Sequence, residues 1–395
     1  MRRDRTFEGV WYAQSLLREL VLIYPTAAIM MQHQGIPAVS LSVLFMIWSG
    51  ASVLLEVPTG VLADRVSRRN LLVLSGAVKG FAFVIWWLAP VFWGFAAGFI
   101  VWSLGSALRS GTAEAFLHDT LAYQGRLADF ERIYGWGHAV GTAGVAAALL
   151  LGGWMAEGGY QWPLLLSVAA PWAASLLIFV GLREPPRSAP AQAGSFLGTL
   201  RDGLDEVRGR RLAGLVVAMI ALLPTVYDVL EEYVGPLLDE LDFSLTGVGL
   251  AYGLAFVIRA VSMAGAYRLG VPSLSRLCAL FVAGGVVLSV GAAAGGITAV
   301  FGLCGYFALS GIADVLLRSR LQRFIRGHAR ATITSFAGLL QEVFSLVLYL
   351  GIGMAAQGFG WQPAVAGAGL WLMLCAALFL GYAQAVSRSR TTSAT

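Results

Sequence analysis

The sequence contains few charged residues for its length. Asp, Glu, Lys and Arg make up 12% of its 395 residues, whereas soluble domains carry about a quarter. Apolar residues make up 58% of the chain, and its mean hydropathy is +0.74. This composition excludes an ordinary soluble domain and predicts a protein that crosses a lipid bilayer several times.

Lysine, cysteine and catalytic patterns are also scarce. Lys79 is the one lysine among 27 basic residues, and these residues gather between apolar runs, so the net charge of +5 does not indicate binding to nucleic acid. The cysteines Cys278, Cys304 and Cys375 lie inside apolar runs without disulfide or metal spacing. The four histidines form no metal-binding pair, and the sequence has no phosphate-binding loop. We therefore expect no metal, no cofactor and no enzymatic activity.

Long apolar runs predict an all-α protein with twelve transmembrane helices. A helix needs about 20 predominantly apolar residues to cross a bilayer. Runs of this length cover residues 9–33, 38–62, 71–91, 94–120, 131–156, 162–182, 212–238, 245–269, 274–295, 298–320, 331–356 and 362–385.

The connections between these runs alternate in charge. Odd-numbered connections contain no Lys or Arg, whereas the even-numbered connections are rich in arginine. Because basic loops remain on the cytoplasmic side, we expect the even-numbered loops and both termini to be cytoplasmic. The charged start of the chain, MRRDR, predicts an uncleaved first helix. The expected location is the inner (cytoplasmic) cell membrane.

One longer connection divides the chain into two similar halves. Residues 183–211 predict a cytoplasmic central loop with an interfacial helix, between six-helix bundles at 1–182 and 212–395. Ser110–Leu117 aligns without gaps on Ser310–Leu317, which indicates an internal repeat. The fold expected is two pseudo-symmetric six-helix bundles.

The repeat also carries expectations for two pairs of residues. Gly111 and Gly311 are expected to let helices approach closely. Glu114 and Asp314 are expected to lie at one depth of a cavity.

The connection after the second run carries a specific motif, Gly60-x-x-x-Asp64-Arg65-x-x-Arg68-Arg69. It resembles the loop between helices 2 and 3 of the major facilitator superfamily of secondary transporters. The resemblance implies alternating access and a gating role in which this loop latches one conformation. The stretches EVPTG and SGTAEAF look most like those of bacterial drug and metabolite exporters in that superfamily.

Ionisable residues inside membrane spans are costly and are functional candidates for that reason. Glu56, Glu114 and Asp314 are the candidates for proton coupling, with Glu56 favoured as a desolvated carboxylate. Arg109 is expected to pair with a nearby carboxylate, Glu19, Glu56 or Glu114. The candidate cavity residues are Arg18, Glu19, Tyr24, Trp48, Arg109, Tyr227, Asp228, Glu231, Tyr252, Phe256, Arg259 and Glu342.

Two charged residues also have structural interpretations. Lys79 is expected on the lipid or flank side of its helix, with its ammonium reaching the interface. Asp228, Glu231 and Glu232 share one helical face, which indicates a cation, a proton or a buried basic partner there, and the alternative is that Glu232 is solvated near an outer loop.

The charges inside the spans lead to three functional hypotheses. Carboxylates outnumber basic groups there, which favours a proton-coupled exporter of a small amphiphilic or cationic compound, acting as a monomer. The alternative is a proton symporter that takes up a sugar or organic acid, with Arg18, Arg109 and Arg259 as anion ligands. A third hypothesis is a membrane receptor or scaffold that does not transport.

Overall fold

The computed structural model describes residues 5–185, 211–270, 272–324 and 329–392, and it confirms the all-α membrane fold. The expected interfacial helix of the central loop lies outside the described residues. The chain divides into two compact units. Unit 1 contains α1 to α8 and Phe243–Gly253, which includes the start of α13, and unit 2 contains α10 to α12 and the chain from Leu254 onward. The three-part division expected from sequence stays a prediction.

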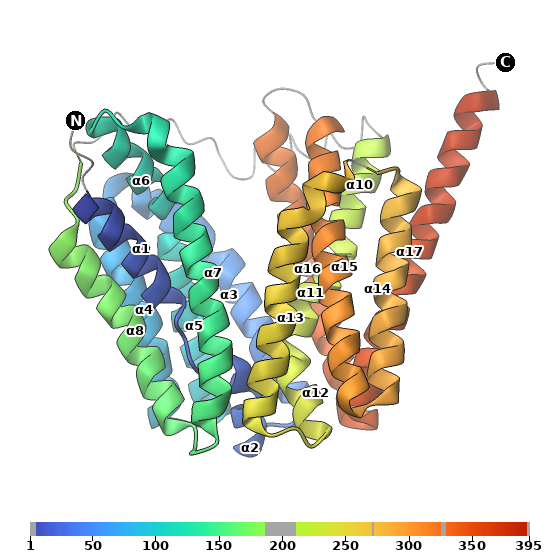
Figure 1. The fold of residues 1–395 in the computed structure, drawn as a ribbon, viewed down its shortest axis with the longest axis horizontal. Helices are drawn as coiled ribbons and strands as arrows, with labels where there is room; N and C mark the ends of the chain where they lie inside the picture. The colour runs from blue at the N-terminus through green and yellow to red at the C-terminus, as the bar shows by residue number, and fades with distance from the viewer. Residues whose placement is uncertain (1–4, 186–210, 271, 325–328, 393–395) are drawn as a thin grey trace. The chain divides into compact units, whose positions relative to one another are not determined.

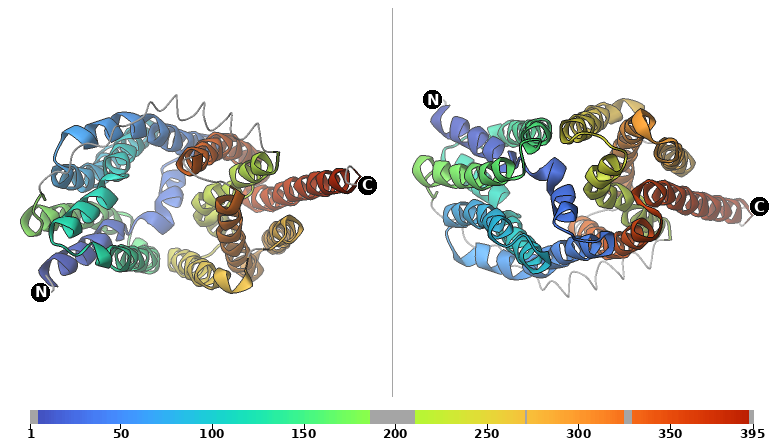
Figure 2. Two further views of the ribbon diagram at one scale, coloured as in Figure 1. Left: turned by 90° about the horizontal axis from the view of Figure 1, so that it is seen from above. Right: turned by 90° about the horizontal axis from the view of Figure 1, so that it is seen from below.

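Within each unit the helices run side by side (Figure 1), and Figure 2 views them end-on. The helices of unit 1 are α1 (Arg5–Glu19), α2 (Ala27–His33), α3 (Ala38–Arg65), α4 (Arg68–Leu88), α5 (Phe92–Arg109), α6 (Thr112–Tyr123), α7 (Phe130–Ala156) and α8 (Gln161–Gly181), with 3-10 turns η1 (Tyr24–Thr26) and η2 (Leu127–Asp129).

The remaining elements are α10 (Arg211–Leu222), α11 (Thr225–Leu230), the 3-10 turn η3 (Glu231–Tyr233), α12 (Val234–Glu240), α13 (Leu245–Gly265), the 3-10 turn η4 (Ala266–Leu269), α14 (Leu274–Ala294), α15 (Gly296–Phe324), α16 (Ala329–Phe359) and α17 (Trp361–Thr392).

Three expected spans are interrupted helices. Ten helices in the described ranges are long and apolar enough to cross a membrane, and the first and fourth expected spans are not among them. The first span breaks between α1 and η1, and the fourth breaks between α5 and α6, where Gly111 has a φ of +68°. The seventh is divided into α10, α11, η3 and α12, with Pro224 preceding α11. Proline has no N–H to continue a helix, and glycine tolerates a positive φ.

The two repeated glycines have different roles. A methyl group at Gly311 would lie 3.0 Å from the Cγ atoms of Arg259 and Met263, so close packing at this glycine is confirmed. A methyl group at Gly111 would meet no atom within 4 Å, so the same expectation is wrong there. Gly111 instead permits the turn between α5 and α6, whereas α15 continues through Gly311.

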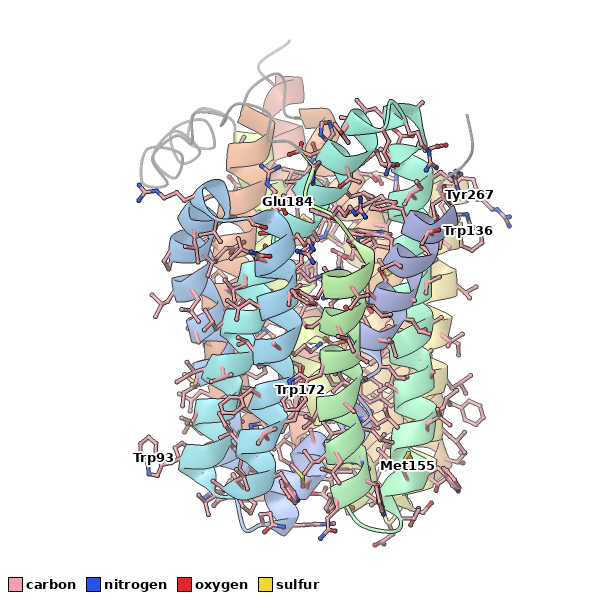
Figure 3. The ribbon with its side chains drawn as sticks, turned by 90° about the vertical axis from the view of Figure 1, so that its left-hand side faces the viewer. Trp93, Trp136, Met155, Trp172, Glu184 and Tyr267 are labelled. Atoms are coloured by element: carbon pink, nitrogen blue, oxygen red, sulfur yellow. The ribbon has the colours of Figure 1, made fainter. Side chains whose placement is uncertain are left out.

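Exposed tryptophans mark both ends of unit 1. Trp93, at the start of α5, and Trp136, near the start of α7, extend outward toward opposite ends of the helices (Figure 3). Trp154 and Trp162, beside the connection from α7 to α8, are also exposed. Tryptophan prefers the interface between hydrocarbon and water, so this pattern fits helices that span a bilayer.

A carboxylate in the connection after α7 caps the start of α13, the part of that helix that belongs to unit 1. Glu157 Oε1 accepts a hydrogen bond of 2.8 Å from the backbone N–H of Thr246, in the first turn of α13. This hydrogen bond holds the pKa of Glu157 below its ordinary value of 4.5. An anion at a helix N-terminus is stabilising because the first N–H groups have no partner within the helix.

The cap predicts a pH-dependent stability difference between the wild type and Glu157→Gln. A carboxyl whose pKa is lowered on folding stabilises the protein fully above its unfolded pKa, and this contribution is lost as the pH falls through the folded pKa. The wild type should therefore unfold at a higher temperature than Glu157→Gln above pH 4.5. The difference should vanish at lower pH in thermal unfolding of the detergent-solubilised protein. A constant difference across the acid range would contradict the capping role.

Candidate functional site

Unit 1 contains a cavity of about 370 Å³ between α1, α5, α6 and α7. Its charged lining residues are Arg18, Glu19, Arg109 and Glu114. Ser15, Ser106 and Ser110 add hydroxyl groups, and Trp11 and Val145 add apolar surface. Arg18, Glu19 and Arg109, which were predicted from sequence as candidate cavity residues, line this cavity, and so does Glu114, a candidate for proton coupling.

Lys79 is buried beside this cavity, so its predicted position at the lipid interface is wrong. Its side chain is only 6% exposed. The ammonium donates to the Tyr24 hydroxyl at 2.9 Å and to the backbone carbonyl of Arg18 at 3.2 Å, and it lies 3.7 Å from Glu19 Oε2. It also lies 5.5 Å from the centroids of the Tyr24 and Trp102 rings. The inward face of α4 therefore carries the cation that was expected on the lipid or flank side of this helix.

The Lys79 ammonium stabilises the end of α1, and the carbonyl group of Arg18 at that end in turn accepts a hydrogen bond from the buried ammonium. Carbonyl groups in the last turn of a helix lack intrahelical partners, and a cation near them is stabilising. Lys79 supplies that cation at the carbonyl of Arg18. Glu19 forms an ion pair with Arg18 as well as with Lys79, so one carboxylate is shared by two cations.

Arg109 has no such partner. It is the last residue of α5, it is half-buried, and no described residue accepts a hydrogen bond from it. Of the three carboxylates predicted to pair with Arg109, Glu114 and Glu56 are wrong, and Glu19 acts on Arg109 by its charge without forming an ion pair with it. Glu114 accepts a hydrogen bond from the Tyr134 hydroxyl, and Glu56 is exposed, with the Ser110 hydroxyl at 3.5 Å. The turn at Gly111 separates α6 from α5, so Arg109 and Glu114 do not share one helical face.

Unit 2 contains a chain of polar side chains that joins three helices. Arg318 Nε donates to Asp314 Oδ1 at 2.7 Å, within α15. Arg318 also donates to the side-chain oxygen of Gln341, on α16, at 3.4 Å. The Gln341 amide nitrogen in turn donates to Asp228 Oδ2, on α11. Sequence analysis did not identify Gln341, because an amide inside an amphipathic run carries no charge to mark it.

Two carboxylates in unit 2 form no ion pair among the described residues, although the Tyr227 hydroxyl hydrogen-bonds Glu231 and the charge of Arg259 acts on it. Glu231 and Glu232 form the start of η3 and are half-buried, so the alternative of a solvated Glu232 near an outer loop is wrong. In the described part of the chain, no Lys, Arg or His lies within ion-pair distance of either carboxylate. Arg259, the nearest cation to Tyr227, stacks on that ring with its guanidinium 3.5 Å from the centroid.

The basic loop after α3 has partners that were not predicted. Arg68 forms an ion pair with Asp119 on α6, and Arg69 lies over the Phe179 ring. The Glu184 carboxylate, after α8, accepts from the Ser67 hydroxyl and from the backbone N–H groups of Arg68 and Arg69, at 2.8 to 2.9 Å. Figure 3 labels Glu184 at this end of unit 1. Glu184 and Asp119 therefore fix the start of α4.

The other predicted site residues are not among those that line the unit 1 cavity. Tyr24 and Trp48 pack on Trp102 with centroid distances of 5.6 and 5.5 Å. The side chain of Asp64, in the predicted latch, lies outside the described residues. The remaining candidates lie on α3 (Gly60 and Arg65), on α13 (Tyr252 and Phe256) and on α16 (Glu342).

The contacts of Lys79 predict that Tyr24→Phe destabilises the protein. The variant keeps the ring but removes an acceptor from a buried ammonium, which costs about 1–3 kcal/mol. Tyr160→Phe is the matched control, because its hydroxyl contacts His33 in an exposed hydrogen bond. Thermal unfolding should show a clear decrease for Tyr24→Phe and little change for the control. Equal changes would contradict the role given to the Lys79–Tyr24 contact.

Solved structures with the same fold are transporters. A mutant form of the nucleoside transporter NupG has a TM-score of 0.77 at 14% identity, over 94% of this chain and 99% of its own. A bacterial homologue of the human lysosomal transporter Spinster, facing inward and unoccupied, has a TM-score of 0.72 at 15% identity, over 96% and 94% of the two chains. A D-xylose–proton symporter has a TM-score of 0.70 at 14% identity, over 95% and 97%.

These low identities show the fold alone. No curated protein sequence matches the chain. Residues 19–348 match the sequence profile of the Major Facilitator Superfamily. The chain therefore belongs to the Major Facilitator Superfamily and is a membrane transporter, not an enzyme.

Proposed function

We propose that this transporter is proton-coupled and moves a small organic compound by alternating access. One observation carries the proposal: Glu231 and Glu232 lie inside a membrane helix, at its 3-10 break, and form no ion pair among the described residues. An ionised carboxylate in a weakly polar environment is costly unless it is paired. A proton removes that charge, so these two groups suit a carrier that loads and releases protons during the cycle.

The three carboxylates favoured by the sequence fit this role less well. Glu56 is exposed on α3, with the Ser110 hydroxyl beside it, so the surrounding protein does not bury it. Asp314 is buried but forms an ion pair with Arg318. Glu114 is exposed and hydrogen-bonded by Tyr134. Glu231 and Glu232 differ from all three because they are half-buried and have no ion pair.

The chain of polar side chains in unit 2 includes Asp228 and Asp314 but not Glu231 or Glu232, so the two pairs of carboxylates have different partners. Arg318 can only donate hydrogen bonds, so the Gln341 oxygen must face Arg318 and its NH₂ must face Asp228. Asp228 and Asp314 therefore each have a hydrogen-bond donor on a neighbouring side chain, whereas Glu231 and Glu232 have no Lys, Arg or His within ion-pair distance among the described residues.

The orientation of the chain is part of the same proposal. The arginine-rich connections support an inner-membrane protein with both termini in the cytoplasm. Gln34, in the loop after α2, and Tyr123, at the end of α6, are exposed, and the three native cysteines are buried.

Cysteine labelling in intact cells tests this orientation. Gln34→Cys should react with an impermeant thiol reagent, and Tyr123→Cys should react only after the membrane is opened. The wild type, with its native cysteines, is the background control. The reverse pattern would contradict the proposed orientation.

Vesicles containing the purified protein test proton coupling. They are incubated with a mixture of metabolites under pH gradients of both signs, and the compounds that accumulate are identified by mass spectrometry. At least one compound should accumulate with one sign of the gradient, and a proton ionophore should abolish the effect. The effective sign also gives the direction of transport, which the sequence predicts to be export.

Variants identify the proton carrier. Glu231→Gln and Glu232→Gln, alone or together, should lose accumulation against a gradient while retaining exchange of labelled for unlabelled compound, because exchange needs only alternation. Glu56→Gln is the control and should accumulate substrate normally. Full accumulation by the double variant, or accumulation independent of pH, would refute the proposal.

A further inference from the structure

We infer that the transported compound carries an anionic group, a carboxylate or a phosphate ester, and that Arg18 and Arg109 bind this group in the unit 1 cavity. The inference rests on the proposed transport function, and it adds the substrate's chemical class and its binding site. It departs from the cationic compound favoured by the sequence, because the local charges around the cavity differ from the count over all spans.

The cavity and its wall carry an excess of positive charge. Arg18, Lys79 and Arg109 contribute three cations, and Glu19 is the carboxylate among them. Glu114 also lines the cavity, where it is exposed and hydrogen-bonded by Tyr134, so the three cations exceed the two carboxylates by one charge. Uncompensated charge within a membrane span is costly. An anionic ligand would therefore be favoured electrostatically over a neutral or cationic ligand of the same shape.

The hydrogen-bond partners show which cations are available. Lys79 already has the Tyr24 hydroxyl and the Arg18 carbonyl as acceptors. Glu19 is shared by Arg18 and Lys79. Arg109 has no acceptor among the described residues, and the buried Nε of Arg18 also has none. A guanidinium group presents paired N–H donors that match the oxygens of a carboxylate or phosphate.

Helix α7 provides space opposite the arginines. Gly137 and Gly141 line the cavity where other residues would place side chains. A methyl group at Gly141 would lie 3.6 Å from Glu19 Cγ and 3.6 Å from the backbone oxygen of Ser15, which are ordinary contacts, so a larger side chain here would press on these two cavity-lining residues. The volume of about 370 Å³ lies in the range for small-molecule sites. Trp11 and Val145 offer apolar contact to the remainder of the ligand.

Thermal unfolding of the full-length purified protein tests the site without needing transport. The probes are inorganic phosphate and succinate as anions, tetraethylammonium as a cation and mannitol as a neutral compound, each at the same ionic strength in chloride. Phosphate or succinate should raise the unfolding temperature of the wild type in a saturable way, and the other two should not. A larger effect of phosphate indicates a phosphate ester, and a larger effect of succinate indicates a carboxylate.

Substitutions test whether the stabilising anion binds in the unit 1 cavity. Arg109→Gln should weaken the apparent affinity for the effective anion at least tenfold, and Arg109→Lys should restore part of it. Gly141→Val changes no charge and should also weaken binding, so it tests the site even if Arg109→Gln fails to fold. Arg268→Gln is the matched control, because Arg268 is exposed on η4, beside Tyr267. This control should bind the anion as the wild type does.

The outcomes of these experiments distinguish the anion site from the proton coupling. The inference is overturned if neither anion stabilises the wild type, if tetraethylammonium does so instead, or if Arg109→Gln and Gly141→Val bind normally. Saturable anion binding without pH-driven accumulation would remove the proton-coupling proposal and leave the anion site intact. Proton-driven accumulation of a cation or neutral compound would do the opposite.

Discussion

The burial of the Lys79 ammonium is the interaction on which the unit 1 cavity depends. An ammonium group can remain in an apolar bundle only where acceptors and countercharge surround it. The Arg18 carbonyl, the Tyr24 hydroxyl and Glu19 provide this surrounding, and all three lie around the break in the first membrane helix. Lys79 thereby stabilises the end of α1, and that end places Arg18 and Glu19 in the cavity wall.

The first membrane helix of each half is interrupted at charged residues, but the charges are balanced differently. In unit 1 the break follows Arg18 and Glu19, where cations are in excess. In unit 2 the 3-10 turn contains Glu231 and Glu232, which form no ion pair among the described residues. Broken helices commonly form binding sites in transporters. The excess of cations in unit 1 favours an anionic group as ligand, and the carboxylates without ion pairs in unit 2 favour protons.

Hydropathy and loop charge predicted the main architecture because they depend on local composition. The expected spans at 71–91 and 162–182 correspond closely to α4 (Arg68–Leu88) and α8 (Gln161–Gly181). The interruptions were not predicted, because a break is stable only when a distant group satisfies the exposed backbone. Lys79, for example, is 61 positions from the carbonyl that it binds.

The site was predicted in part, and the failures have physical causes. Arg18, Glu19 and Arg109 were identified because ionisable residues in spans are rare. Glu56 was favoured as a desolvated group, although the surrounding protein does not bury it, because sequence does not show which helical face is covered. Glu184 was missed because its role depends on a helix start 115 to 117 positions away. The general lesson is that charge identifies candidates, while contacts across the bundle determine what each one does.

The central claim is that the substrate's anionic group binds to both Arg18 and Arg109, where it accepts hydrogen bonds from the guanidinium groups and balances their charge. The most direct measurement is an experimental structure of the protein with selenate, an anomalously scattering analogue of sulfate and phosphate. The account predicts an anomalous peak within hydrogen-bond distance of both guanidinium groups, and its absence in Arg109→Gln. A wild-type cavity that stays empty at a selenate concentration that stabilises the protein, with the anion bound elsewhere, would contradict the account.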